Sequence, residues 1–447
     1  MNRDAIATAT ANSPSVAEVL IGRGMLVQAG ALFTRTFAGK TAMLFADDLG
    51  WAAAGPATEA SLNAAGITTT RHVLRADPRP KPTVELADTF RDMLATGDAV
   101  PVSIGSGVMN DVVKHAAFSL DRPYLCVATA ASMDGYTSAG APLSQGGFKM
   151  TIQCRPARAL LADLDVISAA PPEMTGWGYG DLAGKVPAGA DWMVADALGI
   201  EPIDDIAWPM VQHPLRGWLS EPERVAAGDP AAIEGLFTGL TLVGFAMEAH
   251  GTSRPASGAD HQIAHLWEME GLALNGERVS HGACVAVGTV TVMRLWDWLL
   301  TRDIGALDID RAVAMAPGME AKARMIDDAF GPGEVAQRAK AETAAKHIDP
   351  PALAARLKRL QQVWAGLVPR LSRQLQGADE MIAHLSAAGA PHDAAQIGVG
   401  PAHLHRTTAN ARFLRSRYTL LDLLDETGLL TGAIDATQGP ASQDKAG

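Results

Sequence analysis

One aspartate and three histidines in this chain have the types and spacing of metal ligands. His261 and His265 are four residues apart, so a helix would place both imidazoles on one face. His281 follows after Asn275-Gly276, a pair that can fold the chain back, and Asp181 stands at an expected helix start. One carboxylate with two or three imidazoles on neighbouring helices suits a divalent cation that keeps an open position for a substrate oxygen. Considered alone, Asp181 would be a helix N-cap, which is the commonest role of such an aspartate. Each histidine considered alone would be an ordinary surface or core residue.

A glycine-containing turn is the second candidate for chemistry. Gly105 and Gly107 lie within Val102–Asp111, after an expected strand and at the start of an expected helix. The glycines let the backbone approach a ligand closely, and the N–H groups of a helix N-terminus favour a pyrophosphate, which suits a dinucleotide. A Gly-x-Gly turn can equally serve only to pack a helix on a strand, so both interpretations stay open.

Asp47 ends the first expected strand, within Phe45-Ala-Asp-Asp48. A carboxylate there could accept hydrogen bonds from an adenosine ribose and would repel a 2′-phosphate, which favours NAD over NADP. In the Rossmann fingerprint the acid follows the glycine turn, whereas Asp47 precedes it. The sequence therefore does not encode the classical Rossmann unit.

A run of small and hydroxyl residues, Thr129-Ala-Ala-Ser-Met-Asp-Gly-Tyr-Thr-Ser138, follows another expected strand. Open parallel sheets bind ligands at the carboxyl ends of their strands, so Asp134 and its neighbours are candidates for contacts to a ligand. An Asx-type turn that leads into a loop is the alternative.

The elements that must position these motifs begin with a sheet. Residues 40–165 alternate short apolar runs with helical stretches, a pattern typical of parallel strands joined by crossover helices. The expected strands are Thr41–Ala46, Thr68–Leu74, Val100–Ile104, Tyr124–Ala128 and Leu164–Ile167, with helices over Ala52–Ala65 and Val84–Leu94. We therefore expect an α/β dinucleotide-binding domain over 1–170, with an open, Rossmann-like parallel sheet.

After Pro171 and Pro172 the pattern changes, because alanine and leucine recur at helical spacing and no convincing strand pair appears. The expected helices are Asp191–Leu198, Glu234–His250, Ala283–Leu300, Pro351–Val368 and Ala409–Leu424. An all-α helical-bundle domain that binds metal and substrate is therefore expected over 171–432. The polar segment 433–447 is expected to be a disordered tail.

Composition limits the classes of function. The chain has 447 residues, of which 48% are hydrophobic, so it can bury a large core. Its 37 basic and 49 acidic residues give a formal charge of −12, which disfavours binding to nucleic acid or to an anionic membrane surface. The cysteines Cys126, Cys154 and Cys284 form no CxxC pair, and we expect them to be reduced core residues of a cytoplasmic protein.

No membrane span and no export signal are expected. The most apolar segments, Leu236–Ala249 and Ala283–Met293, are shorter than the roughly 20 residues that a bilayer requires, and they contain glycine and threonine. The N-terminal segment Met1–Leu20 has no apolar region of the secretory type.

Together these motifs resemble the sn-glycerol-1-phosphate dehydrogenase branch of the superfamily of iron-containing alcohol dehydrogenase, glycerol dehydrogenase and dehydroquinate synthase. The resemblance is carried, in colinear order, by Gly105-Ser-Gly-x-x-x-Asp111, Thr129 to Ser138, Gly178-x-Gly-Asp-Leu-x-x-Lys185, Asp260-His261-x-x-x-His265, His281-Gly and Phe413-Leu-Arg-Ser-Arg-Tyr-Thr-Leu-Leu-Asp422. It implies a dehydroquinate synthase-like fold.

The resemblance also implies roles for individual residues. Asp181, His261 and His281 would hold one divalent metal ion, zinc, iron or nickel, and Asp134 and His265 would touch the substrate. The residues implied to bind the nicotinamide dinucleotide are Gly107, Val108, Met109, Asn110, Asp111, Thr129, Ala130, Ala131, Ser132 and Ser138. The turn reads Gly-Ser-Gly where many members have three glycines, and no Asn-Thr pair follows Asp47, so the choice between NAD and NADP stays open.

The implied activity is a metal-dependent, NAD(P)-linked interconversion of dihydroxyacetone phosphate and sn-glycerol 1-phosphate. The ion would act as a Lewis acid. Asp181 would supply negative charge, His265 would relay the proton, and Asp134 would hydrogen-bond a substrate hydroxyl. The phosphate needs cationic donors, for which Lys149 and Lys185 are the nearest candidates by sequence, although either could be a solvated or structural lysine.

Other functions stay open at this point. A dehydrogenase of glycerol or of another polyol or polyol phosphate is the nearest alternative. A dehydroquinate synthase-like lyase needs several Lys and Arg near the metal, and the stretches Asp134–Gly147 and Gly251–His261 contribute only Arg254. A sensor that binds metal and nucleotide without turnover is the remaining alternative. We also expect a homo-oligomer.

Overall fold

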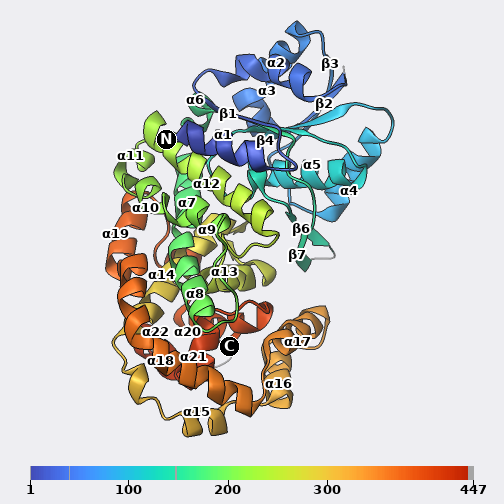
Figure 1. The fold of residues 1–447 in the computed structure, drawn as a ribbon. Helices are drawn as coiled ribbons and strands as arrows, with labels where there is room; N and C mark the ends of the chain where they lie inside the picture. The colour runs from blue at the N-terminus through green and yellow to red at the C-terminus, as the bar shows by residue number, and fades with distance from the viewer. Residues whose placement is uncertain (1, 40, 146–147, 441–447) are drawn as a thin grey trace. The chain divides into compact units, whose positions relative to one another are not determined.

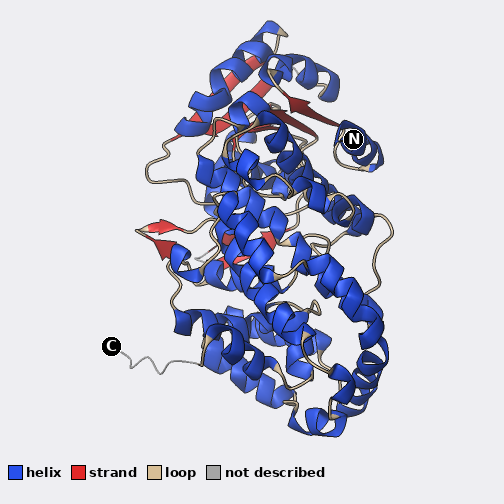
Figure 2. Cartoon of the chain, turned by 90° about the vertical axis from the view of Figure 1, so that its left-hand side faces the viewer, coloured by secondary structure: helices blue, strands red, loops and turns tan. Residues whose placement is uncertain are grey.

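The computed structural model describes residues 2–39, 41–145 and 148–440 (Figure 1). Its contacts divide the chain into two compact units. The first unit comprises Met1–Leu182, Ile206–Ser253 and Ala387–Gly389, and the second unit comprises Ala183–Asp205, Arg254–Ser386 and Ala390–Gly447. Helices make up most of the described chain (Figure 2). The units follow contacts rather than chain order, so the expected domain limits at 170 and 432 remain predictions.

A six-stranded sheet lies in the first unit, and every neighbouring pair of its strands is parallel. The strand order is β1-β8-β5-β4-β2-β3. The strands are β1 (Glu18–Gly22), β2 (Thr41–Asp47), β3 (Thr68–Leu74), β4 (Val100–Gly105), β5 (Leu125–Ala128) and β8 (Ala159–Asp163). The expected open, Rossmann-like parallel sheet is confirmed, with strands where they were expected over 41–46, 68–74, 100–104 and 124–128.

The expected strand Leu164–Ile167 is wrong. These residues form the short helix α6, and the strand is the segment just before them, β8. Asp163 is the N-cap of α6, because its side chain accepts the N–H of Asp165 at 3.0 Å. The backbone therefore changes from strand to helix at this aspartate, one residue before the expected strand begins.

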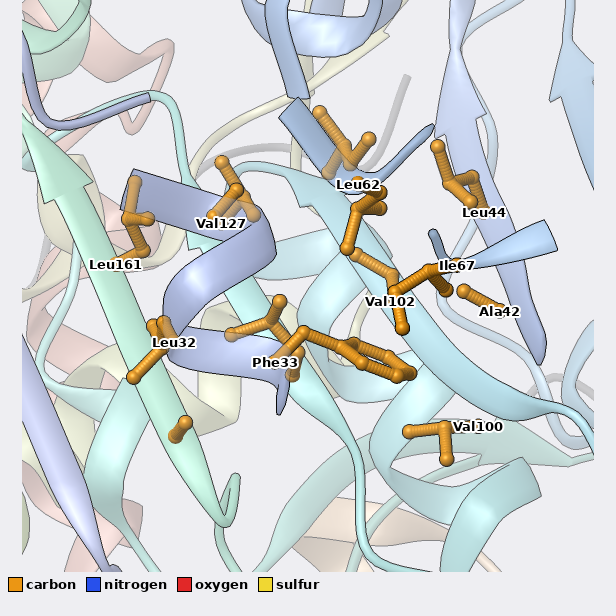
Figure 3. Close-up of a cluster of buried hydrophobic side chains, with 14 of the residues drawn as sticks. Leu32, Phe33, Ala42, Leu44, Leu62, Ile67, Val100, Val102, Val127 and Leu161 are labelled. Atoms are coloured by element: carbon orange, nitrogen blue, oxygen red, sulfur yellow. The ribbon is translucent and has the colours of Figure 1, made fainter. Parts of the chain in front are cut away.

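Helices connect the strands and pack against them. They are α2 (Ala29–Thr36), α3 (Asp48–Ala64), α4 (Val84–Leu94) and α5 (Gly107–Ser119). Figure 3 shows side chains of α2, such as Leu32 and Phe33, beside Val102, Val127 and Leu161 of strands β4, β5 and β8. All five are fully buried, and each such side chain contributes about 1.5–3 kcal/mol to stability.

The order of the strands creates a switch point between β2 and β4. From β2 the chain continues to β3 on one side, whereas from β4 it continues to β5 on the other side. In such sheets the connections at the carboxyl ends diverge there and leave room for a ligand. A Cβ added at Gly50, in the first turn of α3, would lie 3.3 Å from the Cα of Gly105, so the ends of the two strands are close.

The first unit also contains a two-stranded antiparallel sheet and further helices. The hairpin of β6 (Ala141–Gln145) and β7 (Phe148–Ile152) was not expected. The other helices are α1 (Asn2–Asn12), α7 (Pro172–Ala183), whose last residue belongs to the second unit, α9 (Ala207–Gln212), α10 (Leu215–Trp218), α11 (Pro222–Ala226) and α12 (Pro230–His250).

The second unit is helical, as expected for the C-terminal region. Its main helices are α8 (Lys185–Ala197), α13 (Ala259–Met269), α14 (His281–Leu300), α15 (Ile309–Met315), α16 (Met319–Phe330), α17 (Glu334–Lys346), α18 (Pro350–Leu375), α19 (Ala378–Ala387) up to residue 386, α20 (Pro401–Asn410), α21 (Leu420–Glu426) and α22 (Leu430–Gln438). Leucines at helical spacing on α18, such as Leu353, Leu357 and Leu360, are buried, which is the pattern of an amphipathic helix.

Two expectations for this unit need correction. Ala409–Leu424 is not one helix, because α20 ends at Asn410, a 3-10 turn follows over Ala411–Leu414, and α21 begins only after the extended residue Thr419. Thr419 and Asp422 form a capping box, which starts a new helix at this point. The expected disordered tail is also wrong over residues 433–438, which lie in α22 with Ala433 and Ile434 buried; residues 441–447 lie outside the described residues.

A short antiparallel pair, β9 (Ala273–Leu274) and β10 (Glu277–Arg278), joins α13 to α14. Asn275 and Gly276 connect the two strands with φ values of 54° and 85°. Positive φ at both central residues is what a type I′ hairpin turn requires. The expectation that Asn275-Gly276 folds the chain back is confirmed, although the strand pair itself was not expected.

Two helices have the length and apolar composition of membrane spans, α12 with 21 residues and α14 with 20. The apolar windows of these helices are 72% and 78% buried within the fold. The expectation that the apolar segments are too short to span a bilayer is therefore wrong. The absence of a membrane span stays an expectation, supported by the burial of these helices.

Candidate active site

Three imidazoles lie together in the second unit. His261 and His265 are one turn apart on α13, and His281 is the first residue of α14. The ring centroids are 5.4 Å apart for His261 and His281, 5.7 Å for His265 and His281, and 6.0 Å for His261 and His265. The expected grouping of the three histidines by two neighbouring helices is thus present.

The close packing of α13 and α14 explains this grouping. A Cβ added at Gly288 of α14 would lie only 2.5 Å from the carbonyl oxygen of Asp260 on α13, so only glycine fits there. Ser280 caps α14, because its hydroxyl accepts the N–H of Ala283 at 3.3 Å. The hairpin between the helices and this cap fix His281 at the N-terminus of α14.

The hydrogen-bond partners of the three rings differ. The Nδ1 atom of His261 contacts a carboxylate oxygen of Asp260, and Nδ1 of His281 lies 3.1 Å from Oε1 of Glu268. Within the described residues, His265 makes no hydrogen bond. Burial lowers the pKa of His265 well below its usual value; the Glu268 carboxylate opposes this shift, whereas the positive charge of Arg415 adds to it.

Asp191 of α8 holds the N-terminus of the helix that carries two of the histidines. Its carboxylate accepts the N–H of Ala259 at 2.8 Å and the N–H of Leu420, in α21, at 3.0 Å. Burial raises the pKa of Asp191 to about 7, against the lowering effect of the hydrogen bond from Ala259 and of the Arg254 charge. This carboxylate therefore ties three helices of the second unit together.

Arginines near the histidines are a feature that the sequence analysis missed. Residues 415–419 contact α13 and the residues just before it. Arg417 donates to the carbonyl oxygen of Ser257 at 2.8 Å, and Thr419 donates to Oε1 of Gln262 at 3.1 Å. Burial and the neighbouring Arg254 charge lower the pKa of Arg417 to about 9. Burial also lowers the pKa of Arg415. The only signal in the sequence was the Arg-x-Arg within the C-terminal motif, to which no role was given.

The structure describes the two lysines proposed for a phosphate unequally. Lys185 is the first residue of α8, and its side chain is fully buried. The side chain of Lys149 lies outside the described residues. A role of Lys185 at a phosphate stays a prediction, and Arg415 is a further cation whose charge acts on His265.

Asp181 lies in the first unit, within α7, and it is fully buried. The expectation that it starts a helix is wrong, because α7 begins at Pro172 and Asp181 stands near its end. Its Oδ2 atom accepts the N–H of Asp134 at 3.0 Å. The two aspartates expected to act in the chemistry are therefore brought together, although they are far apart in sequence.

The glycine turn has the geometry of an anion site. Gly105 ends β4, and Ser106 is the N-cap of α5 without a side-chain hydrogen bond to the helix N–H groups. A Cβ at Gly105 would lie 2.9 Å from Cβ of Met109, so a larger residue would collide with the first turn of α5. Gly107 and Val108 are half-buried, whereas Met109, Asn110 and Asp111 are buried. Backbone N–H groups, rather than side chains, are what this turn can offer to a phosphate.

The acid at the end of β2 has a structural partner. Asp47 caps α3 by accepting the N–H of Gly50 at 2.6 Å. One carboxylate oxygen is engaged in this cap. Asp47 stands at the switch point of the sheet, next to Gly105, which is where a ribose would lie if the turn binds the pyrophosphate.

A lysine to which the sequence analysis assigned no role, Lys114, holds the loop after β5 through the loop's carbonyl oxygens. The buried Nζ of Lys114, on α5, donates to the carbonyl oxygens of Gly135 at 2.8 Å, Ser138 at 3.2 Å and Gly140 at 2.9 Å. It also lies 3.6 Å from the carboxylate of Asp111. A lone lysine among the apolar residues of α5 was the available signal.

The other expected cofactor residues lie in this loop. Thr129, Ala130, Ala131, Ser132 and Ser138 are all buried, with exposures of 9% or less. The N–H of Thr129 donates to the carbonyl oxygen of Gly105 at 3.1 Å, which joins the loop to the glycine turn. The first unit therefore groups the residues expected at the dinucleotide with Asp134 and Asp181, and the second unit groups the histidines.

Comparisons with known proteins agree with these motifs. A family model described as iron-containing alcohol dehydrogenase matches residues 20–171. The chain is 40% identical over 191 residues to the glycerol-1-phosphate dehydrogenase (NAD(P)+) of Bacillus subtilis, an alignment that covers 43% of this chain and 48% of the relative. It is 29% identical over 340 residues to that of Geobacillus stearothermophilus, which covers 75% of this chain and 74% of the relative. The expected resemblance to the iron-containing alcohol dehydrogenase superfamily is confirmed, and the matching family model covers about the first third of the chain.

Solved structures of other dehydrogenases show the same fold. A probable glycerol dehydrogenase from Sinorhizobium meliloti matches 96% of this chain and 98% of its own chain, with a TM-score of 0.61 and 15% identity. The NADH-dependent butanol dehydrogenase of Thermotoga maritima matches 94% and 97%, with a TM-score of 0.59 and 14% identity. The expected dehydroquinate synthase-like architecture, a parallel α/β part followed by a helical part, is confirmed. The first curated relatives are matched over only about half of their own length.

Proposed function

We propose that this protein interconverts dihydroxyacetone phosphate and sn-glycerol 1-phosphate, with NAD(P) as redox cofactor and one divalent metal ion. The observation that carries the proposal is the group of three imidazoles on α13 and α14. Within the described residues, two of the rings contact a carboxylate through Nδ1, and the third makes no hydrogen bond. The relatives named glycerol-1-phosphate dehydrogenase support the choice of substrate.

The proposed metal ligands are His261, His281 and Asp181. Neutral imidazole nitrogens and a carboxylate oxygen form a donor set that accepts zinc, iron(II) or nickel. Asp181 is fully buried, and a buried carboxylate is costly unless a positive charge compensates it. When bound, the ion supplies Lewis-acid polarisation of the substrate oxygen, and the nicotinamide carries the hydride.

The proposed proton relay is His265. The lowered pKa leaves its ring neutral near pH 7, with one nitrogen that accepts a proton and one that donates. In the oxidation of glycerol phosphate His265 takes the proton of the reacting hydroxyl, and in the reduction it returns one. Asp134, whose N–H is fixed by the Asp181 carboxylate, hydrogen-bonds a second hydroxyl of the substrate and orients the carbon that reacts.

The proposed phosphate donors are Arg415 and Arg417 rather than Lys185. The Arg415 charge acts on the ring of His265, so it lies near the proposed site of the chemistry. A half-buried guanidinium whose pKa is lowered by burial is stabilised by an incoming anion. This favours a phosphorylated substrate over a neutral polyol such as glycerol.

The proposed function also includes a nicotinamide cofactor, a cytoplasmic location and a homo-oligomer. The N-terminus of α5, behind the Gly105 turn, would bind the pyrophosphate, and Asp47 at the switch point favours NAD, with NADP as the alternative. A cytoplasmic location is supported by three buried free thiols; burial raises the pKa of Cys126 to about 12. A homo-oligomer remains a prediction.

The test is a comparison of substrates after metal reconstitution. Protein stripped by a chelator and reloaded with zinc, iron(II) or nickel should oxidise NADH or NADPH at 340 nm with dihydroxyacetone phosphate, and much more slowly with dihydroxyacetone. Chiral analysis should give sn-glycerol 1-phosphate. His261→Ala should lose turnover, whereas His405→Ala, which removes an imidazole paired with Asp435 at 2.9 Å outside the cluster, should retain it. Equal rates for the phosphorylated and neutral substrates would redirect the assignment to a polyol dehydrogenase.

A further inference from the structure

The carboxylate of Asp260 is fixed against the ring of His261. It is fully buried in the first turn of α13. One oxygen accepts the N–H of Gly258 at 3.2 Å, and the other contacts Nδ1 of His261. The positive end of the helix dipole favours a carboxylate at this position. Asp260 is therefore held by the backbone in the orientation that receives the ring.

Glu268 plays the same part for the histidine on the other helix. It lies in the last turn of α13, with 9% of its surface exposed, and its Oε1 atom is 3.1 Å from Nδ1 of His281. The two imidazoles come from different helices, yet both receive a carboxylate of α13 at the same ring nitrogen. A ring nitrogen of His265, between them on α13, lies within 4.8 Å of a Glu268 oxygen, but His265 makes no hydrogen bond within the described residues.

A carboxylate at Nδ1 decides what the opposite nitrogen can do. A neutral imidazole has one N–H donor and one acceptor nitrogen. An acceptor next to Nδ1 holds the proton there, which leaves the lone pair on Nε2, and the negative charge makes that nitrogen more basic. His261 and His281, each with a carboxylate at Nδ1, therefore keep their proton on that nitrogen. The ring of His265 makes no such hydrogen bond within the described residues and can exchange protons at either nitrogen.

We propose that Asp260 and Glu268 are positioning residues that fix His261 and His281 as Nε2 ligands of the divalent ion, and that His265, which hydrogen-bonds no carboxylate within the described residues, is left to proton transfer. The inference rests on the proposed function, because it assumes that His261 and His281 bind the metal. It goes beyond that function by assigning roles to two residues outside the ligand set. It also accounts for the cost of burying two carboxylates beside neutral rings, since a bound cation compensates their charge.

The test measures zinc affinity of the full-length apo protein by competition with a chromophoric chelator. Asp260→Asn and Glu268→Gln keep the size of each side chain and remove its charge. Each should weaken zinc binding by about 10- to 100-fold, the range typical of such outer partners. The matched control is Glu270→Gln, which removes an exposed carboxylate two residues from Glu268 that pairs with His403 at 2.6 Å. The control should bind zinc as the wild type does.

The outcomes separate this inference from the proposed function. Wild-type affinity in both variants would overturn the inference alone, and a wild type that binds no zinc would overturn both. Loss of all zinc from Glu268→Gln, as in His281→Ala, would make Glu268 a ligand and overturn its positioning role. Circular dichroism of each apo variant checks the fold, and visible spectra after cobalt substitution report the ligand geometry independently of turnover. An unchanged cobalt spectrum in both variants would contradict the proposal.

Discussion

His265 differs from its two neighbouring histidines in its surroundings rather than in its position on the helix. His261 lies one turn before it on the same face of α13, and the centroids of the two rings are 6.0 Å apart. Only the contacts of the ring nitrogens distinguish a proposed ligand from a proposed acid–base group. The spacing of the histidines was visible in the sequence, whereas the Glu268 contact of His281 was not, because it depends on how α14 packs against α13.

At this scale we expect His265→Gln to reduce turnover by about 10²- to 10⁴-fold, the range of a lost acid–base group, with zinc affinity unchanged. Steady-state rates at 340 nm and chelator competition measure the two quantities separately. Partial recovery of the rate by added imidazole would support a proton-transfer role. Zinc binding as weak as in His261→Ala would instead identify His265 as a ligand.

The phosphate assignment predicts an effect on substrate binding. Arg415→Gln should raise KM for dihydroxyacetone phosphate by about tenfold or more, as expected for a lost charged hydrogen bond, with a small change in kcat and no change for dihydroxyacetone. Arg415→Lys should recover part of the loss. Arg359→Gln is the control, because Arg359 is an exposed arginine that donates to the carbonyl oxygen of Ala197 at 2.7 Å. A KM for the phosphorylated substrate equal to that of the control would exclude Arg415 as a donor.

At the scale of elements, α7 packs on the loop that is expected to bind the cofactor. A Cβ added at Gly178 would lie 1.8 Å from the carbonyl oxygen of Ala131. Gly178→Ala should therefore lower the free energy of unfolding by about 1–3 kcal/mol or more and weaken NADH binding. Gly235→Ala, at a site on α12 with no atom within 4 Å, should raise stability by about 0.5–1 kcal/mol. Denaturant titration and NADH fluorescence measure both effects, and equal stability of the two variants would contradict this packing.

The junction of α8, α13 and α21 should make stability depend on pH. The pKa of Asp191 is raised from 3.8 to about 7 by burial, so the folded state binds a proton more tightly than the unfolded chain. Its contribution to stability is full below about pH 4 and is lost as pH rises to about 7; the shift of about 3 units corresponds to about 4 kcal/mol. Asp191→Asn should flatten the pH dependence of the unfolding free energy in this window. The matched control is Asp349→Asn, which makes the same substitution at the exposed N-cap of α18.

The elements show where sequence patterns suffice. The alternation of strands with helices predicted β2, β4 and β5 because parallel strands buried in a sheet are continuous apolar runs. It also predicted β3, although that strand is polar and has no buried residue. The strand at Leu164–Ile167 was misplaced because apolar residues stand on both sides of Asp163, and the capping contact of Asp163 marks the change from strand to helix. The predicted helix Ala409–Leu424 failed for a similar reason. The contact that starts the new helix α21, the Thr419 capping box, forms only when the backbone at Thr419 is extended.

At the scale of the whole molecule, the motifs in colinear order predicted a family resemblance, and the comparisons confirm that resemblance. Composition and periodicity predicted a parallel α/β part and a helical part, which the fold and its structural neighbours confirm. Composition and periodicity could not identify residues that hold other residues in place. Examples are Lys114, which binds carbonyl oxygens of the loop after β5, and Asp191, which accepts the N–H of Ala259 at the start of α13. Their partners are backbone atoms that only the folded chain brings within reach.

The most direct test of the central claim is a titration of metal against rate. Chelator-stripped protein is mixed with NADH and dihydroxyacetone phosphate, zinc, iron(II) or nickel is added stepwise, and the initial rate is followed at 340 nm. The account predicts no rate without metal, saturation at one ion per chain for the wild type, and no recovery for Asp181→Asn at the same concentrations. A rate that is independent of metal, or full recovery in Asp181→Asn, would contradict it.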